Sequence, residues 1–484
     1  MLFRQIFEPK LAQYAYLIGC QKTKEAIIID PLRDIDTYVR LAEAENVNIV
    51  AVAETHIHAD FLSGAREFAE QHGTRVYVSD EGREAGWASE WADPEKYDIV
   101  RLSDNDTFKI GNIKFRAVHS PGHTPEHVSY LVTDEGGGAT TPMGIASGDF
   151  VFVGDLGRPD LLESAAGIHG MMESSAHTLF GSLPKFTSLE DHLQVWPAHG
   201  AGSACGKALG AVPQSTVGYE KRYNASLGAA AEGEDEFVGA ILSGQPEPPL
   251  YFARMKRDNR AGVPVLNGMP GPRAYGVADL RGVIEKKNAT IIDARIDREG
   301  FMDRHIVGSI YAPMNRTFSQ VVGSLIEDET TPLVLIVNET QLDEGLRDLV
   351  RIGYDNIIGY LTPDTLMRYF EEENGGYASI PTLRWDEFEM LRKEGDAVLD
   401  VRFAAEFNEL HIPGAINASY TRLPTYLDRL PKDKTLLVHC RTGARAAAAA
   451  SYLAKEGYDV KYVDDLIESY HLVGPVETGE VVVA

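Results

Sequence analysis

Cysteine, positive charge and long apolar runs are all scarce in this chain of 484 residues. Its three cysteines, Cys20, Cys205 and Cys440, are odd in number and far apart, which argues against a disulfide framework and favours a reducing compartment. Lys and Arg number 46 against 72 Asp and Glu, so the formal net charge is −26. That balance repels nucleic acid and anionic membrane surfaces, and neither is expected as a partner.

No stretch approaches ~18 consecutive apolar residues, so no membrane-spanning helix is expected. The first residues, MLFRQIFEPKLAQYAYLIGC, lack a basic start followed by a long apolar run. We therefore predict no signal peptide and a cytoplasmic location. With 44% hydrophobic and 24% charged residues the chain is globular, and its length predicts about three domains. We expect a multidomain enzyme of this size to form a homo-oligomer.

Residues 1–240 alternate short apolar strands with turns and helical stretches. Several of these strands end in histidine or aspartate. Because side chains at the ends of successive strands converge at one edge of a sheet, these residues can meet in space. Histidine nitrogen and carboxylate oxygen suit borderline divalent metals. The stretches are THIHAD with His56, His58 and Asp60, SPGH with His123, SGD with Asp149, and PAHG with His199.

The order THxHAD, SPGHT, GD, PAHG resembles the metallo-β-lactamase superfamily, whose fold is an αββα sandwich. The stretch GDFVFVGDLGRPDL is similar to the persulfide dioxygenase branch of that superfamily. The resemblance implies one Fe(II) per chain, and two histidines with one carboxylate would leave positions open for O2 and a substrate sulfur. By the same resemblance the metal ligands are His56, His123 and Asp149, and the groups around them are His58, Asp60 and His199.

Phe61 stands where dinuclear relatives usually have a further metal-binding histidine, which favours a single metal. Three alternatives remain open. The first is a glyoxalase-II-like thioester hydrolase with two zinc ions, fused to a sulfurtransferase. In the second, the domain is only a metal-binding scaffold attached to a sulfurtransferase. The third is a redox sensor or partner-binding protein built on former enzyme domains.

Two further residues are candidates for binding the substrate. Arg158, in LGRPD, could clamp the carboxylate of a thiol carrier, or could form a salt bridge within its own turn with Asp155 or Asp160. Relatives that use glutathione often carry a tyrosine just after PAH. Here the sequence is PAHGAGSACGK, which argues against glutathione as the preferred carrier and brings Cys205 towards the metal. That cysteine could take up a persulfide, shape the pocket, or be a buried loop residue.

The C-terminal half contains an internal repeat of about a hundred residues, too long for a solenoid unit. It predicts two tandem copies of one small α/β domain, a first copy at 276–370 and a second copy at 378–484. Residues 241–275, rich in Pro and Gly, are predicted to connect them to the N-terminal domain. The matching pairs are Asp293 and Asp400, Arg295 and Arg402, Glu299 and Glu406, His305 and His411, and Gly308 and Gly414.

The second copy contains a reactive-cysteine loop, HCRTGAR, between a buried strand and an alanine-rich helix. Backbone N–H groups above a helix N-terminus, with Arg441 and Arg445, favour a thiolate at Cys440. This pattern resembles rhodanese, and its C-x4-R loop is one residue shorter than the C-x5-R loop of phosphatases. The first copy carries LVLIVNETQLDEG at that place and has no nucleophile.

Together these resemblances point to a persulfide dioxygenase–rhodanese fusion. They imply oxidation of a low-molecular-weight persulfide by O2 to sulfite and free thiol. They also imply transfer of sulfane sulfur through Cys440, to sulfite or from thiosulfate. The identity of the thiol and the direction of transfer in the cell stay open.

Overall fold

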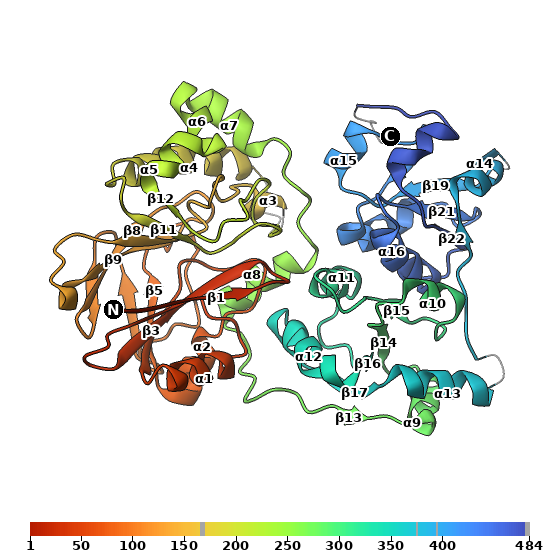
Figure 1. Cartoon of the computed structure of the whole chain (residues 1–484), viewed down its shortest axis with the longest axis horizontal. Coiled ribbons are helices and arrows are strands. Elements are labelled where there is room, and N and C mark those ends of the chain that lie inside the picture. The colour runs from red at the N-terminus through yellow and green to blue at the C-terminus, as the bar shows by residue number, and fades with distance from the viewer. Residues whose placement is uncertain (165–169, 374–375, 394, 480–484) are drawn as a thin grey trace. The chain divides into compact units, whose positions relative to one another are not determined.

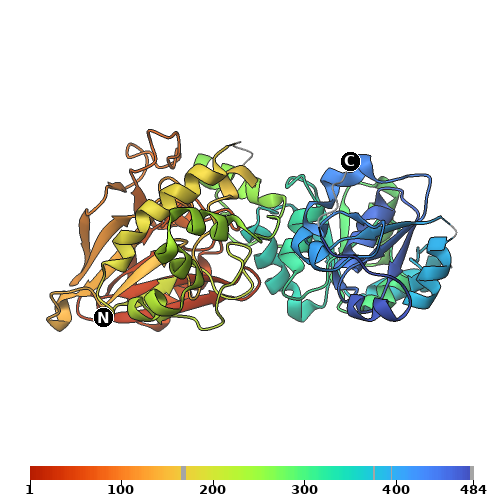
Figure 2. The same cartoon turned by 90° about the horizontal axis from the view of Figure 1, so that it is seen from above.

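The computed structural model describes residues 1–164, 170–373, 376–393 and 395–479. The chain divides into two compact units, Met1–Met269 with Val350–Gly353, and Pro270–Leu349 with Tyr354–Ala484. The units can be followed by colour in Figures 1 and 2, from red to light green and from green to blue. Residues 165–169 and 480–484, which belong to the predicted domains 1–240 and 378–484, lie outside the described residues. In the described part of the chain no helix is long and apolar enough to cross a membrane.

The first unit is built on two six-stranded sheets, which run in the orders β1-β2-β3-β4-β5-β6 and β12-β11-β10-β9-β8-β7. Its buried strands, such as QYAYLIG and EAIII, are rich in the β-branched and aromatic residues that fit a pleated surface. The first sheet contains β1 (Leu2–Glu8), β2 (Gln13–Gly19), β3 (Glu25–Ile29), β4 (Asn48–Ala53), β5 (Arg75–Ser79) and β6 (Ile99–Leu102). The second contains β7 (Thr107–Ile110), β8 (Ile113–His119), β9 (Val128–Asp134), β10 (Gly144–Gly148), β11 (Gln194–Pro197) and β12 (Ser215–Thr216).

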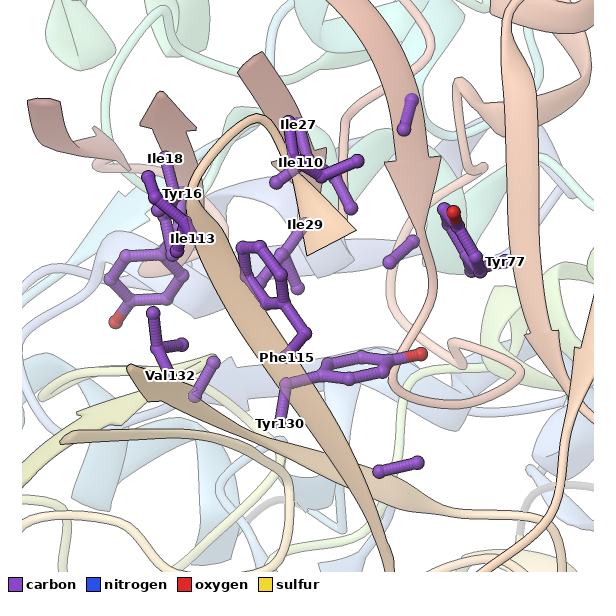
Figure 3. Packing of buried hydrophobic residues seen from close by; sticks show 14 of the residues in the cluster. Tyr16, Ile18, Ile27, Ile29, Tyr77, Ile110, Ile113, Phe115, Tyr130 and Val132 are labelled. Atoms are coloured by element: carbon purple, nitrogen blue, oxygen red, sulfur yellow. The ribbon is translucent and has the colours of Figure 1, made fainter. Parts of the chain in front are cut away.

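The two sheets pack face to face over one hydrophobic core. Figure 3 shows Tyr16 and Ile29 of the first sheet gathered with Phe115 and Tyr130 of the second. Helices cover the outer faces, so the predicted αββα sandwich is confirmed. Those on the side of the first sheet are α1 (Asp36–Ala44) and α2 (Ala65–His72), and those on the side of the second are α4 (Met172–Thr187), α5 (Val217–Tyr223), α6 (Ala225–Glu232) and α7 (Glu234–Leu242). A short helix, α3 (Leu161–Ser164), precedes α4.

The stretch predicted as a connector holds a helix, α8 (Tyr251–Ala261), that belongs to the first unit. Its buried face includes Tyr251, Phe252 and Met255. Asn259 fastens the helix to the THIHAD loop, because its side-chain amide donates to the carbonyls of His58 and Phe61 at 2.9 and 2.7 Å. Helix α8 is therefore part of the wall around the predicted metal site.

The second unit contains two five-stranded sheets with one and the same order, β13-β17-β16-β14-β15 and β18-β22-β21-β19-β20, all pairs parallel. Both copies also keep a buried carboxylate–guanidinium pair, Asp293 with Arg295 and Asp400 with Arg402. The strands of the first copy are β13 (Arg273–Ala274), β14 (Thr290–Asp293), β15 (Ile310–Tyr311), β16 (Leu333–Ile336) and β17 (Ile357–Leu361). Those of the second are β18 (Thr382–Leu383), β19 (Ala397–Asp400), β20 (Ile416–Asn417), β21 (Leu436–His439) and β22 (Val460–Val463).

Helix α16 (Ala444–Lys455) packs against β21 and β22 of its own copy and against β15 of the first copy. Its run of buried alanines suits that position, because small side chains let the helix approach strands on both sides. The other helices of the first copy are α9 (Val277–Lys286), α10 (Arg298–Asp303), α11 (Phe318–Leu325), α12 (Leu342–Arg351) and α13 (Pro363–Glu373). Those of the second are α14 (Trp385–Lys393) and α15 (Ala404–Glu409), with a 3-10 segment at Tyr420–Arg429.

Candidate functional sites

Three predicted metal ligands meet at one edge of the first unit's sheets. His56 follows β4, His123 follows β8 and Asp149 follows β10. One possible ligand atom from each lies within 4.8 Å of the others, and all three residues are buried. The Nε2 atoms of His56 and His123 stand 3.9 and 3.5 Å from an Asp149 carboxylate oxygen. This is the two-histidine, one-carboxylate set that the sequence predicted.

Hydrogen bonds on the far side of each imidazole orient it towards that set. The Thr55 hydroxyl donates to Asp30, so it accepts from Nδ1 of His56 at 2.9 Å. Nδ1 of His123 donates to the Arg158 carbonyl at 2.9 Å. Both arrangements leave the Nε2 lone pair free, as a histidine that ligates a metal requires.

The inward-facing atoms also fit a cation. His123 Nε2 and both Asp149 carboxylate oxygens are buried without a hydrogen-bond partner in the described part of the chain. Burial, together with nearby His58 and His123, lowers the pKa of His56 well below its ordinary value. Burial raises the pKa of Asp149 to about 6, although His199 opposes the shift. Neutral imidazoles around an uncompensated carboxylate form a donor set that a divalent metal would satisfy.

A histidine that sequence analysis did not single out positions Asp149. Nε2 of His127 accepts the Asp149 backbone N–H at 3.0 Å, and its Nδ1 donates to the Ser120 hydroxyl at 2.9 Å. Gly148 makes room for this contact: it has φ +56°, and a Cβ there would stand 2.5 Å from His127 Nε2. Because both ring nitrogens of His127 are in use, it orients a ligand and does not add one.

His58 is directed away from the three candidate ligands. Its Nε2 lies 3.0 Å from Glu54 and 3.2 Å from Asp30. Burial opposes a charge on His58, but the two carboxylates outweigh burial and raise its pKa well above the ordinary value. Phe61 stacks on the His58 ring at 4.3 Å. Where dinuclear relatives have a metal-binding histidine, this chain has an aromatic side chain that packs against the His58 ring.

Asp60, His199 and Cys205 form a second buried group beside the first. His199 Nε2 lies 3.5 Å from Asp60 and 3.5 Å from Asp149, so it links the two groups. Burial, followed by the charges of Asp60 and Asp149, raises the pKa of the Cys205 thiol well above its ordinary value. Cys205 therefore favours the protonated form in this environment, and the structure brings it to the edge of the candidate metal centre.

Arg158 is a structural neighbour of the metal centre in this arrangement. Its Nε and Nη2 atoms both donate to the Asp160 carboxylate at 2.7 Å, and Nη1 donates to the Ala204 carbonyl at 3.0 Å. The donors that would clamp a substrate carboxylate are thus already occupied, as in the turn salt bridge considered from the sequence. Its own carbonyl orients His123.

A different cation, Lys256 of α8, is buried in this region. Its Nζ has no hydrogen-bond partner within the described residues, and the whole residue is 1% exposed. Burial lowers its pKa to about 8, while Glu126, Cys205, Asp160 and Asp149 act in the opposite direction. Lys256 was not predicted from the sequence, because ARMKRDNRAG is charged and follows a Pro-rich stretch. The spacing of Tyr251, Phe252 and Met255 was the available signal of a helix with one buried face.

The second candidate site is the loop around Cys440, which follows β21 and precedes α16. Cys440 is buried, with 1% of its surface exposed. Gly443, at φ +84°, begins the helix, and a Cβ there would stand 2.3 Å from the Tyr462 hydroxyl and 2.6 Å from Asp464. Only glycine lets the loop pass this close to β22.

The two predicted arginines of this loop lie in different surroundings. Arg445 donates twice to the Glu406 carboxylate, at 2.5 and 2.7 Å, and is within electrostatic reach of Cys440. Burial opposes a charge on Glu406, but Arg445 outweighs it and lowers the pKa of that carboxyl. Arg441 is mostly exposed and pairs with Glu468 at 2.6 Å. Of the two, Arg445 is held beside the thiol, and Arg441 faces solvent.

Known families and proteins match both parts of the chain. Residues 9–192 match the metallo-beta-lactamase superfamily, and residues 385–471 match the rhodanese-like domain. A beta-lactamase hydrolase-like protein of Xylella fastidiosa is 27% identical over 297 residues, which cover 56% of this chain and 62% of that protein's own length. The mitochondrial persulfide dioxygenase ETHE1 of Bos taurus is 27% identical over 267 residues, covering 54% of this chain and 89% of the relative.

A crystal structure described as a metallo-beta-lactamase from Staphylococcus aureus is 39% identical to this chain, with a TM-score of 0.66. The match covers 75% of this chain and 99% of that one. Similarity on this scale extends beyond the residues that match the lactamase superfamily alone. The chain therefore belongs to the metallo-β-lactamase superfamily, as a fusion of a domain related to persulfide dioxygenases with a C-terminal rhodanese domain.

Proposed function

We propose that this protein oxidises a low-molecular-weight persulfide with O2 at one Fe(II) and transfers sulfane sulfur through Cys440. The observation that carries the first activity is the buried set His56, His123 and Asp149, with its unpartnered inward-facing atoms. The similarity to persulfide dioxygenases supports the same reading. Each turnover would consume one persulfide, one O2 and one water, and release one thiol, one sulfite and two protons.

Iron, when bound, would supply the redox chemistry, and the surrounding side chains would bind and shield the substrate. Ile57, Trp87 and Leu162 form a small apolar cluster beside the THIHAD loop, which would exclude water from the reacting sulfur. Lys256 would attract the anionic persulfide group, because it is the buried cation of this region whose ammonium lacks a hydrogen-bond partner in the described structure. His199 would hold Asp60 and Asp149 in place.

Sulfur transfer would use the Cys440 thiolate as nucleophile. It would attack the outer sulfur of thiosulfate, forming a new S–S bond while the original S–S bond breaks and sulfite leaves. The reverse step would return sulfur from the Cys440 persulfide to sulfite and release thiosulfate. Arg445 would balance the negative charge at the loop, since Glu406 holds its guanidinium beside Cys440.

One observation favours a second candidate function, a dinuclear-zinc hydrolase of the glyoxalase II type. Asp60, His199 and Cys205 could hold a second metal next to the first. Against it, His58 is engaged by Asp30 and Glu54, and Phe61 replaces a histidine. Metal analysis separates the two: about one iron per chain supports the dioxygenase, and two zinc ions per chain with thioester hydrolysis would replace it.

The experiment that tests the proposal is O2 uptake by protein loaded anaerobically with Fe(II) and given glutathione persulfide or coenzyme A persulfide. Zinc-loaded protein is the matched control, since zinc does not change its redox state. We expect uptake with iron alone, and sulfite together with thiosulfate as the oxidised products. Absence of uptake with every persulfide by iron-loaded protein would overturn the dioxygenase half of the proposal.

Replacing Lys256 by methionine is expected to raise KM for the persulfide by about 10-fold or more, because a charge-assisted contact is lost. In the wild type the pKa of Lys256 is about 8, so the ammonium is charged below that pH and neutral above it. Binding of the anionic substrate should therefore weaken as pH rises through about 8. Initial rates at several persulfide concentrations from pH 6.5 to 9.5 measure this.

Lys256→Arg is the matched variant, because arginine stays charged across that range. Its KM should not rise between pH 7 and 9. Equal pH profiles for the arginine variant and the wild type would show that Lys256 does not bind the substrate.

A further inference from the structure

A cavity of about 520 Å³ lies between the two copies of the second unit. Tyr420, Ala444 and Arg445 of the second copy line one part of it, and Tyr420 and Arg445 are within electrostatic reach of the Cys440 thiol. Arg298, Glu299 and Tyr311 of the first copy line the facing part. The copy without a nucleophile thus forms one wall of a cavity that Ala444 and Arg445 of the cysteine loop also line.

At this wall the first copy carries charged side chains that the second copy lacks at the matching positions. Arg298 is the first residue of α10, and the first residue of α15, the matching helix of the second copy, is Ala404. The predicted pairing of Glu299 with Glu406 is therefore wrong: the helices match with an offset of 106 residues, which places Glu299 at the position of Ala405 and Gly300 at that of Glu406. In the second copy Glu406 pairs with Arg445 of the cysteine loop. Glu299 of the first copy has no ion-pair partner among the described residues and is exposed at the cavity.

Arg298 reaches the cysteine loop itself. Its Nη2 donates to Asp464 at 2.7 Å and its Nη1 lies 3.4 Å from the carbonyl oxygen of Thr442, inside the CRTGAR loop. Its guanidinium also stands over the Tyr462 ring, 5.9 Å from the centroid. These contacts hold an arginine of the first copy beside the cysteine loop of the second.

Charges of both signs surround the cavity. Arg298, Arg384 and Arg445 are balanced by Asp297, Glu299 and Asp464. A ligand with only negative groups would meet three carboxylates, and one with only positive groups would meet three guanidiniums. A small ligand that carries both signs is complementary to this lining.

We propose that the first copy determines the specificity of sulfur transfer, and that the cavity takes a thiol carrying both an ammonium and a carboxylate, as an amino-acid thiol does. This inference rests on the proposed function of Cys440. The carboxylate would bind Nε of Arg298, which, unlike Nη1 and Nη2, donates to no atom of the described residues. The ammonium would bind Glu299. The thiolate would then attack the outer sulfur of the Cys440 persulfide: one S–S bond forms in the product persulfide, the S–S bond to Cys440 breaks, and the Cys440 thiolate is regenerated.

The test measures transfer from thiosulfate to three acceptors: cysteine, 3-mercaptopropionate, which lacks the ammonium, and cysteamine, which lacks the carboxylate. Glu299→Gln should lower kcat/KM for cysteine and cysteamine by about 10-fold and leave 3-mercaptopropionate unchanged. Arg298→Met should lower kcat/KM for cysteine and for 3-mercaptopropionate by a similar factor and leave kcat/KM for cysteamine unchanged. Comparing each variant with the wild type for one acceptor removes differences in intrinsic thiol reactivity.

The matched controls are Asp303→Asn and Arg304→Met, at the far end of α10 and outside the cavity lining. Both should leave kcat/KM unchanged for every acceptor. Cyanide has neither an ammonium nor a carboxylate, so its use as an acceptor does not depend on Glu299 or Arg298. If the wild type does not transfer sulfur to cyanide, the proposed function of Cys440 is overturned. If the wild type does so, but the Glu299 and Arg298 variants lower transfer to all three thiols equally, only the specificity proposal is overturned. If Arg298→Met also loses transfer to cyanide, Arg298→Lys is the deciding variant. Arg298→Lys protein that keeps transfer to cyanide, with unchanged ratios between the thiol acceptors, supports the proposal. Arg298→Lys protein with altered transfer to cyanide overturns the specificity proposal.

Discussion

Replacement of Asp149 by alanine is expected to abolish metal binding and to lower persulfide-dependent O2 uptake by at least about 100-fold. Loss of a partner that merely orients a ligand commonly costs 10–100-fold, so loss of the ligand should cost at least that. Asp149 is central because its carboxylate lies within 4 Å of His56, His123 and His199. Iron per chain, measured after anaerobic loading and desalting, should fall from about one to near zero.

The matched control is Asp98→Ala, which removes a half-exposed carboxylate of the same unit that pairs with Arg75 on the surface. It should bind iron and consume O2 as the wild type does. Thermal unfolding of the metal-free proteins separates metal loss from misfolding, because removing Asp149 also removes an unpaired buried charge and should not destabilise the apoprotein. An Asp149→Ala variant that keeps one tightly bound iron would exclude Asp149 as a ligand.

Replacement of Cys440 by serine is expected to lower sulfur transfer from thiosulfate to cyanide by on the order of 10³-fold or more, because the covalent nucleophile is lost. O2 uptake with persulfide should stay close to wild type, since the iron site lies in a separate compact unit. The oxidised product should shift from thiosulfate towards sulfite. Separate assays of sulfite and thiosulfate after a fixed uptake of O2 measure that shift.

Cys20→Ala is the matched control for Cys440→Ser. Cys20 is a buried cysteine of the first unit, beside Gly111 and outside both candidate sites. It should leave both activities intact. Full sulfur transfer by Cys440→Ser would show that another residue carries the sulfur.

Local order predicted that histidines and aspartates would meet at one edge of the sheets, whereas the choice of His56, His123 and Asp149 as ligands came from the resemblance to persulfide dioxygenases. Each candidate ligand follows a buried strand, and parallel or adjacent strands bring such positions to one edge of the sheets. The Cys440 loop was predictable for the same reason, since strand, tight loop and helix are contiguous. The sequence also drew attention to Phe61, and the structure adds its contact: Phe61 packs on the ring of His58, which lies against Asp30 and Glu54.

The remaining features depend on contacts between distant segments, which a single sequence does not encode in any local pattern. Lys256 approaches the metal centre only because Asn259 fastens α8 to the THIHAD loop nearly 200 residues earlier. For Arg158 the sequence left a substrate clamp and a turn salt bridge as alternatives, and the structure shows the salt bridge with Asp160 together with a contact to the Ala204 carbonyl. The first copy lacks a nucleophile, and nothing local showed that Arg298 would face the loop of the second copy.

The central claim, persulfide oxidation by O2 at a single iron, is tested most directly by stoichiometry. Iron-loaded Cys440→Ser protein would be given a measured amount of glutathione persulfide or coenzyme A persulfide in air-saturated buffer, and O2, sulfite and free thiol would be followed together. We predict one O2 consumed and one sulfite and one thiol formed per persulfide, with one iron per chain. Thiol release without O2 uptake, or full activity with two zinc ions per chain, would contradict the account.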